Sequence, residues 1–304
     1  MTRNEQVQLL AERAELKRML EHIPAADVID RLGLESRLEE VEETIGNAPN
    51  PSPEPARAWV TFRGKPVVAS HGIFAEFGIS AMGSFAEVVA AVAASHASGP
   101  LKPMGPIPKR QEHQLLITNT VPGSFGFEVE EYQGGPELQS ETSSVAAALE
   151  RTQAILEGTQ ATDDELAEVL SETDSRALNA VRTFLKVMAE NEASCTLQYR
   201  ERVVRFSDPG EVQRSLERLG EQNVKEIPAE ATGQFLGVLP QHRTFEFRMS
   251  DGSRVVTGKV GPTIEDAGKL NELLGSTVKV KLMETRVGNG RSRYVLVEEP
   301  EKVL

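Results

Sequence analysis

Four prolines stand at alternate positions between Asn47 and Pro55, and this run limits the fold more than any other feature of the chain. Proline fixes φ and has no backbone N–H, so such a run forms neither a helix nor an inner strand. Proline-rich segments favour an extended, semi-rigid spacer. We therefore expect a linker over 47–56, which separates a helical segment, 1–46, from the rest of the chain.

Two helices are expected before this linker. Leu9, Leu16 and Ile23 recur every seven residues, and the apolar residues from Leu34 to Ile45 step by 4, 3 and 4, the spacing of a coiled-coil seam. A stripe this narrow is not stable alone in water. It must pack on its hairpin partner, on the rest of the chain or on another protomer. We expect self-association through Leu9, Leu16, Leu34, Leu38, Val41 and Ile45.

Residues 57–222 have the pattern of an α+β domain. Alternation of apolar and polar residues predicts strands over 58–62, 66–70, 114–118, 125–131 and 196–206. Helix starts are predicted where a capping residue precedes an apolar run, at Ser84, Thr162 and Asp208. Apolar residues at helical spacing, between Val145 and Leu156 and between Leu178 and Met188, predict two helices of the same domain.

Residues 223–304 are expected to form a small β-barrel. About five short strands with one inserted helix are typical of an OB-like or SH3-like barrel. Phe245, Phe247 and Met249 alternate along one strand, so we assign them to the barrel core. The predicted fold class is therefore α+β and multidomain: an N-terminal helical hairpin or coiled coil, a central α+β domain and a C-terminal small β-barrel.

Charge is segregated along the chain. Residues 126–175 hold thirteen Asp and Glu against one basic residue, whereas residues 232–297 hold ten Lys and Arg against six Asp and Glu. Such asymmetry bears on partners more than on fold. We expect an acidic partner-binding face that includes Glu128, Glu130, Asp163, Asp164 and Glu168. Solvated helix faces are the competing interpretation. The alternative function is nucleic-acid binding by the basic barrel, through Lys279, Lys281, Arg286, Arg291 and Arg293.

No motif predicts chemistry, so we expect no catalytic residue, cofactor or metal. The five histidines are scattered, and none pairs with Cys195 at the spacing of metal ligands. The string from Pro122 to Glu128 lacks the lysine of a phosphate-binding loop. A turn into a strand explains it, with Gly126 allowing a close backbone approach. A further alternative is a hydrolase that uses His71 with Ser124 or with the acidic cluster.

The bulk composition is that of a globular protein, with 304 residues and 39% hydrophobic residues. A single cysteine excludes an internal disulfide and favours a reducing compartment. The apolar stretch over 85–94 is too short to span a bilayer. We therefore expect a non-enzymatic protein-interaction and assembly protein of the bacterial cytoplasm, with no membrane association. The bacterial setting follows from a general resemblance of the N-terminal helices, the Gly123–Glu128 string and the terminal barrel to bacterial proteins, which implies no particular activity.

Overall fold

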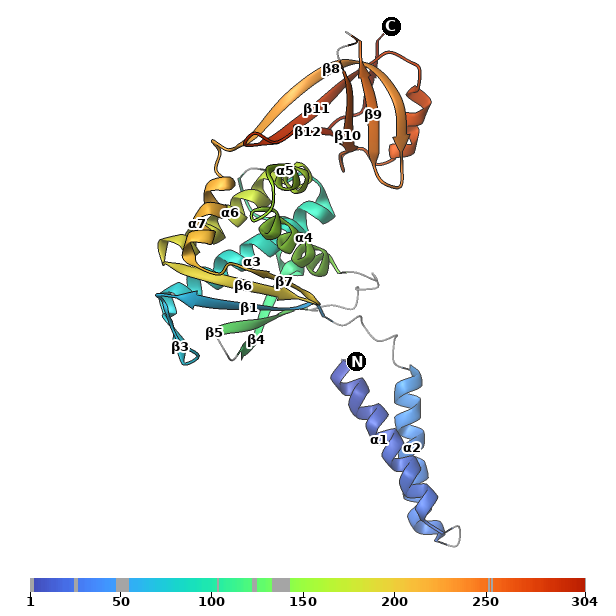
Figure 1. Ribbon diagram of the computed structural model, residues 1–304. Helices are drawn as coiled ribbons and strands as arrows, with labels where there is room; N and C mark the ends of the chain where they lie inside the picture. The colour runs from blue at the N-terminus through green and yellow to red at the C-terminus, as the bar shows by residue number, and fades with distance from the viewer. Residues whose placement is uncertain are drawn as a thin grey trace. The chain divides into compact units, whose positions relative to one another are not determined.

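The computed structural model describes residues 3–24, 27–47, 55–102, 104–121, 125–132, 143–250, 252 and 254–303. The chain forms two compact units. The first contains the N-terminal helices, and the second runs over Ala56–Tyr132 and Ser144–Leu304 (Figure 1). Most of the predicted linker, 48–54, lies outside the described residues. The proposed division of the second unit into domains over 57–222 and 223–304 stays a prediction.

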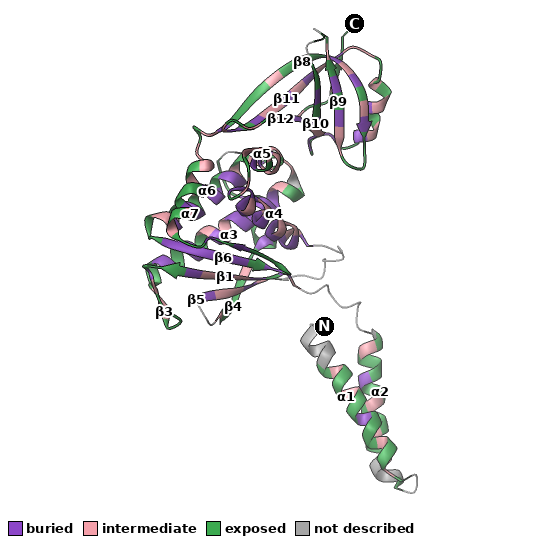
Figure 2. Ribbon diagram, in the orientation of Figure 1, coloured by how far each residue is buried: buried purple, intermediate pink, exposed green. Residues whose placement is uncertain are grey.

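The first unit is a hairpin of two helices, α1 (Arg3–His22) and α2 (Val28–Asn47). Leu16 and Val41 are buried where the helices meet, and the other seam residues are half-buried. Arg31 reaches across and donates to the Leu20 and Ile23 carbonyls, each at 3.0 Å. The rest of the described surface of both helices is mostly exposed (Figure 2). The two helices therefore pack on each other, which is one of the three arrangements that the sequence left open. Packing on another protomer stays a prediction.

The second unit contains an antiparallel sheet. Across the sheet the order is β4 (Leu115–Val121), β5 (Phe125–Glu131), β1 (Arg57–Gly64), β6 (Ala193–Tyr199) and β7 (Arg202–Arg205). A small hairpin of β2 (Val67–Val68) and β3 (Gly72–Ile73) follows β1. The helices are α3 (Ala75–Ser98), η1 (Arg110–His113), α4 (Ser144–Gly158), α5 (Asp163–Ser171), α6 (Ser175–Glu190) and α7 (Pro209–Arg218).

The described helices of this unit lie on one face of the sheet and leave its other face uncovered (Figure 1). On β1, Ala58, Val60 and Phe62 are fully buried in the core that the helices share, so the residues between them lie on the other face. The prediction that the apolar stretch here is too short to span a bilayer was wrong about its length. The stretch belongs to the core helix α3, which is long and apolar enough to cross a membrane by length and composition alone. Two thirds of that apolar window, 67%, is buried in the fold, which is the property of a core helix.

The C-terminal region is a closed five-stranded barrel. Its elements are β8 (Val224–Leu239), β9 (Thr244–Met249), β10 (Val255–Val260), η2 (Ala267–Leu273), β11 (Val278–Val287) and β12 (Arg293–Leu296), with β13 (Glu301–Lys302) beside β11. The strand order is β8-β9-β10-β12-β11, and β11 pairs with β8 to close the ring. β10 and β12 run parallel, and the other pairs are antiparallel. The barrel has its own apolar core, in which Phe245 and Phe247 are buried as predicted.

Local signals were accurate at two of the three predicted helix starts. Thr162 forms a capping box with Glu165, and Asp208 caps α7. The start predicted at Ser84 is wrong: α3 begins nine residues earlier, at Ala75, and the Ser84 hydroxyl donates to the Ala81 carbonyl within the helix. The apolar run around this serine buries enough surface to continue the helix through it. The predicted strand over 196–206 is instead the hairpin of β6 and β7, and only two residues of 66–70 form a strand.

Candidate functional site

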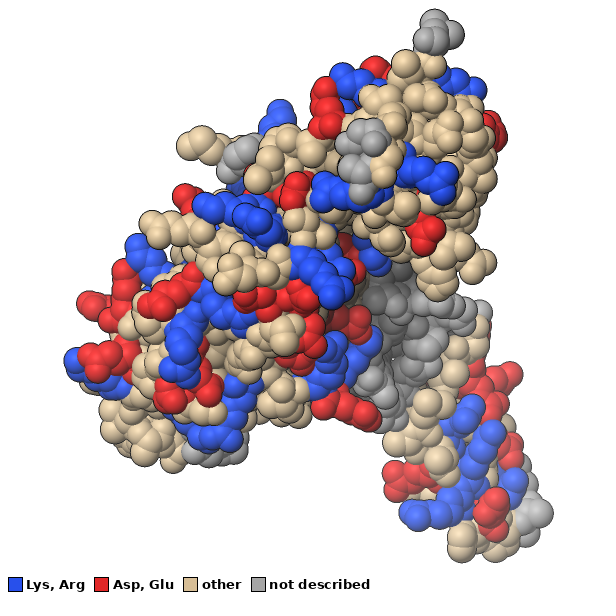
Figure 3. Space-filling model, turned by 45° about the horizontal axis from the view of Figure 1, so that its top comes forward, with Lys and Arg blue, Asp and Glu red and all other residues tan. Residues whose placement is uncertain are grey.

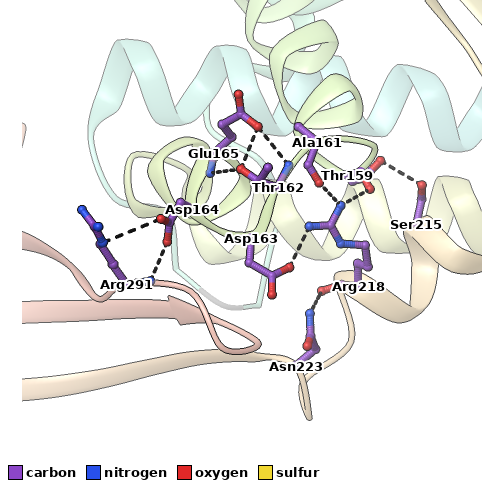
Figure 4. A network of polar contacts seen from close by, with 10 residues as sticks. All are labelled: Thr159, Ala161, Thr162, Asp163, Asp164, Glu165, Ser215, Arg218, Asn223 and Arg291. Carbon is purple, nitrogen blue, oxygen red and sulfur yellow. Dashed lines mark hydrogen bonds and ion pairs between the residues drawn. The ribbon is translucent and has the colours of Figure 1, made fainter.

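Three of the five predicted acidic residues lie on α5, where they face the barrel. The Asp164 carboxylate accepts from the Arg291 backbone N–H at 2.6 Å, and Glu168 lies 3.1 Å from the Arg293 guanidinium. Figure 4 shows Asp164 directed at the β11–β12 loop, which carries Arg291. These carboxylates, predicted to bind an external partner, therefore contact basic groups of the same chain.

The third of them, Asp163, belongs to a network centred on Arg218 (Figure 4). The Arg218 guanidinium donates to Asp163 Oδ1 at 2.8 Å and to the Thr159 carbonyl at 2.7 Å. A Cβ atom on Gly288 would lie 2.5 Å from Asp163 Oδ2, and Gly288 has a φ of +51°. A side chain at this position would meet both a steric and a backbone penalty. The loop after β11 is therefore shaped to sit against the first turn of α5.

The predicted nucleic-acid set is largely paired with carboxylates. Lys279 lies 2.7 Å from Glu230, and Lys281 lies 2.6 Å from Glu298. Among the other members of this set, Arg286 is exposed. The three aromatic rings considered for base stacking, Phe245, Phe247 and Tyr294, are all buried. Figure 3 likewise shows Lys and Arg lying among Asp and Glu on the face that it draws. The described barrel thus offers no stacking platform from these three rings.

The uncovered face of the five-stranded sheet brings together residues from four of its strands, β1, β4, β5 and β6. Trp59 on β1 lies opposite Glu128 on β5 and Gln198 on β6. Next to them is a shallow hollow of about 210 Å³, lined by Trp59, Thr61, Val121, Thr196 and Gln198. Its surface is mostly apolar, and four of its five lining side chains, all except Val121, can also form hydrogen bonds.

Gly126 lies in β5 between two residues that line the hollow, Thr61 and Val121. It pairs with Thr61 on one side and with Val121 on the other. A Cβ atom there would lie 2.5 Å from the Val60 carbonyl oxygen and 2.6 Å from Thr61 Cα. The close backbone approach that the sequence predicted for Gly126 is therefore confirmed.

The remaining two predicted acidic residues lie on this uncovered face. Glu130 pairs with Arg57 at 2.8 Å. Glu128 is half-buried beside Trp59 and pairs in register with Asn119 of β4. Of the five, Glu128 is the one for which the described residues provide no ion-pair contact within 4.0 Å. It is thus the predicted acidic residue best placed to meet an external group.

The edge strand next to this face is uncharged and exposes both apolar and polar residues. β4 carries the sequence from Leu115 to Val121 without a charged residue, and Leu116 and Ile117 are 45% and 56% exposed. An irregularity between Ile117 and Asn119 interrupts its pairing with β5. Such interruptions at an edge limit unwanted strand pairing.

Among the described residues, those considered for catalysis do not form a recognisable site. His71 is exposed in the turn of the β2–β3 hairpin, and Ser124 lies outside the described residues. Cys195 is buried, and burial raises the pKa of its thiol to about 12, so the thiolate is not formed at neutral pH. No group of three or more His, Cys, Asp or Glu side chains suited to a metal ion occurs in the described part of the chain.

One pair, the buried His113 and the half-buried Ser144, was missed from the sequence. The Nδ1 atom of His113 lies 3.0 Å from the Ser144 hydroxyl, while its Nε2 has no hydrogen-bond partner among the described residues. Burial lowers the pKa of His113, which favours the neutral ring. No signal in the sequence predicts this contact, because His113 and Ser144 lie 31 positions apart.

Comparison with protein-family models, with curated proteins and with solved structures found no match to this chain. The candidate site is therefore defined by its own geometry. Sequence reasoning did not single out Trp59, although it is the one tryptophan of the chain. The available signal was its position between Ala58 and Val60, since alternation along a strand puts it on the face opposite the core.

Proposed function

We propose that this chain is a non-enzymatic protein-interaction and assembly protein of the bacterial cytoplasm, which binds a protein partner on the uncovered sheet face. One observation carries the proposal: the only tryptophan of the chain is half-buried at the centre of that face, beside a hollow. Tryptophan buries a large apolar area and retains one hydrogen-bond donor, which is why it is enriched at interfaces.

The chemistry of the face favours a particular kind of partner. An apolar side chain would fill the hollow beside Trp59, and Glu128 would pair with a basic group next to it. Thr61, Thr196 and Gln198 would supply hydrogen bonds. The partner is therefore a protein segment in which an apolar residue stands near a lysine or an arginine.

Assembly is the second part of the proposal. The hairpin of α1 and α2 keeps Leu9, Leu34, Leu38 and Ile45 only half-buried, so its apolar seam has surface left for a further helix. A coiled-coil assembly through this seam would bury that surface. The barrel is proposed to be OB-like rather than SH3-like. Support comes from the parallel pairing of β10 with β12 and the helical turn η2 between β10 and β11.

The decisive test compares two arginine substitutions in the tagged full-length protein. Thr61→Arg places a charged side chain over the hollow, whereas Thr183→Arg places the same side chain on the exposed surface of α6. We expect affinity capture to yield a stoichiometric, nuclease-resistant protein with the wild type and with Thr183→Arg, and to lose it with Thr61→Arg. Recovery of the same proteins with both variants would contradict the proposal.

A further inference from the structure

The barrel contacts the rest of the unit by two kinds of interaction. At one end, Val224 of β8 and Val287 of β11 are buried in the core of the helical layer and not in the barrel core. Beyond them, the contacts with α5 are made by charged groups. Apolar burial therefore anchors one end of the barrel, whereas ion pairs hold the edge formed by β10, β12 and the loop before β12.

Three ion pairs join carboxylates of α5 and of the residue after it, Glu172, to basic side chains of the barrel. Lys259 of β10 lies 3.1 Å from Glu172, and Arg293 of β12 lies 3.1 Å from Glu168. Arg291 binds Asp164 through its backbone N–H, and its side chain, 86% exposed, lies 3.9 Å from that carboxylate. We call Lys259, Arg291 and Arg293 the basic edge.

The basic edge is only partly satisfied by these carboxylates. The Nε atom of Arg293 is buried, yet its contact with Glu168 does not have hydrogen-bond geometry. The side chains of both partners are between a third and a half exposed, so water and salt screen the attraction. An ion pair of this kind is easily exchanged for a better anion.

We infer that the basic edge binds the phosphate backbone of single-stranded nucleic acid and that α5 is a built-in competitor for it. The basic edge lies on two adjacent parallel strands and the loop before one of them, so it offers cations in a row. Phe245, Phe247 and Tyr294 are buried, so binding depends on charge and not on base stacking. The formal net charge of −13 further weakens binding while α5 stays in place. This inference is independent of the uncovered sheet face.

The test removes two negative charges of α5 by replacing its carboxylates with amides of the same size. We call Asp164→Asn with Glu168→Gln the competitor variant. Its amide oxygen at position 164 can still accept from the Arg291 N–H, so we expect it to keep the fold. The control is Glu150→Gln with Glu157→Gln, which removes the same charge from two carboxylates of α4 that pair with Arg200 and Arg202. Equal urea midpoints of the two variants would show that they are comparably folded.

Binding is measured by fluorescence anisotropy with a labelled mixed-sequence DNA strand of about 16 nucleotides, the upper site size of one OB barrel. We expect the competitor variant to bind about tenfold more tightly than the control at low salt. Freeing two cations should also steepen the slope of log K against log salt by about 1.4. Arg291→Glu with Arg293→Glu, added to the competitor variant, should abolish the gain.

Three results would overturn the inference. The competitor variant could bind no more tightly than the control, the wild type could already bind as tightly as the competitor variant, or the gain could survive the two glutamate substitutions. Any of these would mean that α5 does not compete for this edge. Each leaves the sheet-face proposal untouched, because Thr61 and Trp59 are unchanged in all the variants.

Discussion

Gly126→Ala should destabilise the sheet, because the backbone of β1 occupies the space that a side chain needs. The new Cβ atom would lie 2.5 Å from the Val60 carbonyl oxygen, 2.6 Å from Thr61 Cα and 2.7 Å from Thr61 Cγ2. Ordinary carbon contacts are about 3.5–4.0 Å, so the paired strands would have to separate by roughly 1 Å. Overpacking of this kind costs about 1–3 kcal/mol. Two of the three nearest atoms belong to backbone, which cannot rotate away, so we expect the upper half of that range.

The matched control is Gly237→Ala on β8, where no atom lies within 4 Å of the position that Cβ would take. An alanine there should be neutral or should stabilise by up to about 1 kcal/mol, because it restricts the unfolded chain. The assay is urea unfolding, followed by Trp59 fluorescence for the sheet and by circular dichroism for the whole chain. Equal free energies of unfolding for the two variants would refute the reasoning from close approach.

Three further predictions follow from buried or capping groups. Thr162→Ala removes the side-chain oxygen that accepts from the Glu165 N–H, so it should cost about 1 kcal/mol in urea unfolding, and a cost near zero would contradict the cap. Cys195 should resist thiol reagents at pH 8 until the protein unfolds, because its thiol is buried and its pKa is raised to about 12; prompt labelling of folded protein would disprove that burial. Burial lowers the pKa of His113, so its contribution to stability is complete above its ordinary pKa of about 6.5 and is lost as the pH falls below it. Stability measured from pH 7 to pH 5 should therefore fall less steeply in His113→Gln than in the wild type, whatever the absolute stability of the variant, and parallel pH profiles would contradict the assignment.

Local signals predicted the elements of this fold well. The capping box at Thr162 and the cap at Asp208 require only neighbouring residues, so they can be read from the sequence. The strand over Phe125–Glu131 was predicted at its observed bounds, because its alternation matches a half-buried strand. At Ser84 the local signal was misleading, since the burial of a long helix outweighed it.

Long-range contacts could not be predicted in the same way. The sequence does not specify that β1 lies between β5 and β6, so it could not indicate which residues share a face with Trp59. It also could not indicate that Asp164 contacts Arg291, which is 127 positions away. Pairings over such separations depend on the whole topology and not on any periodicity.

The acidic and basic segments of the chain pair with each other where α5 contacts the barrel. An acidic segment and a basic segment of one chain are held at high effective concentration, so they meet each other before either meets a partner. Asp163, Asp164 and Glu168 are therefore already paired with basic groups of their own chain. An external partner of α5 must displace the barrel, whereas a partner of the sheet face need displace only water. For this reason the uncovered face around Trp59 is the stronger candidate surface, although the charge pattern of the sequence directs attention to α5.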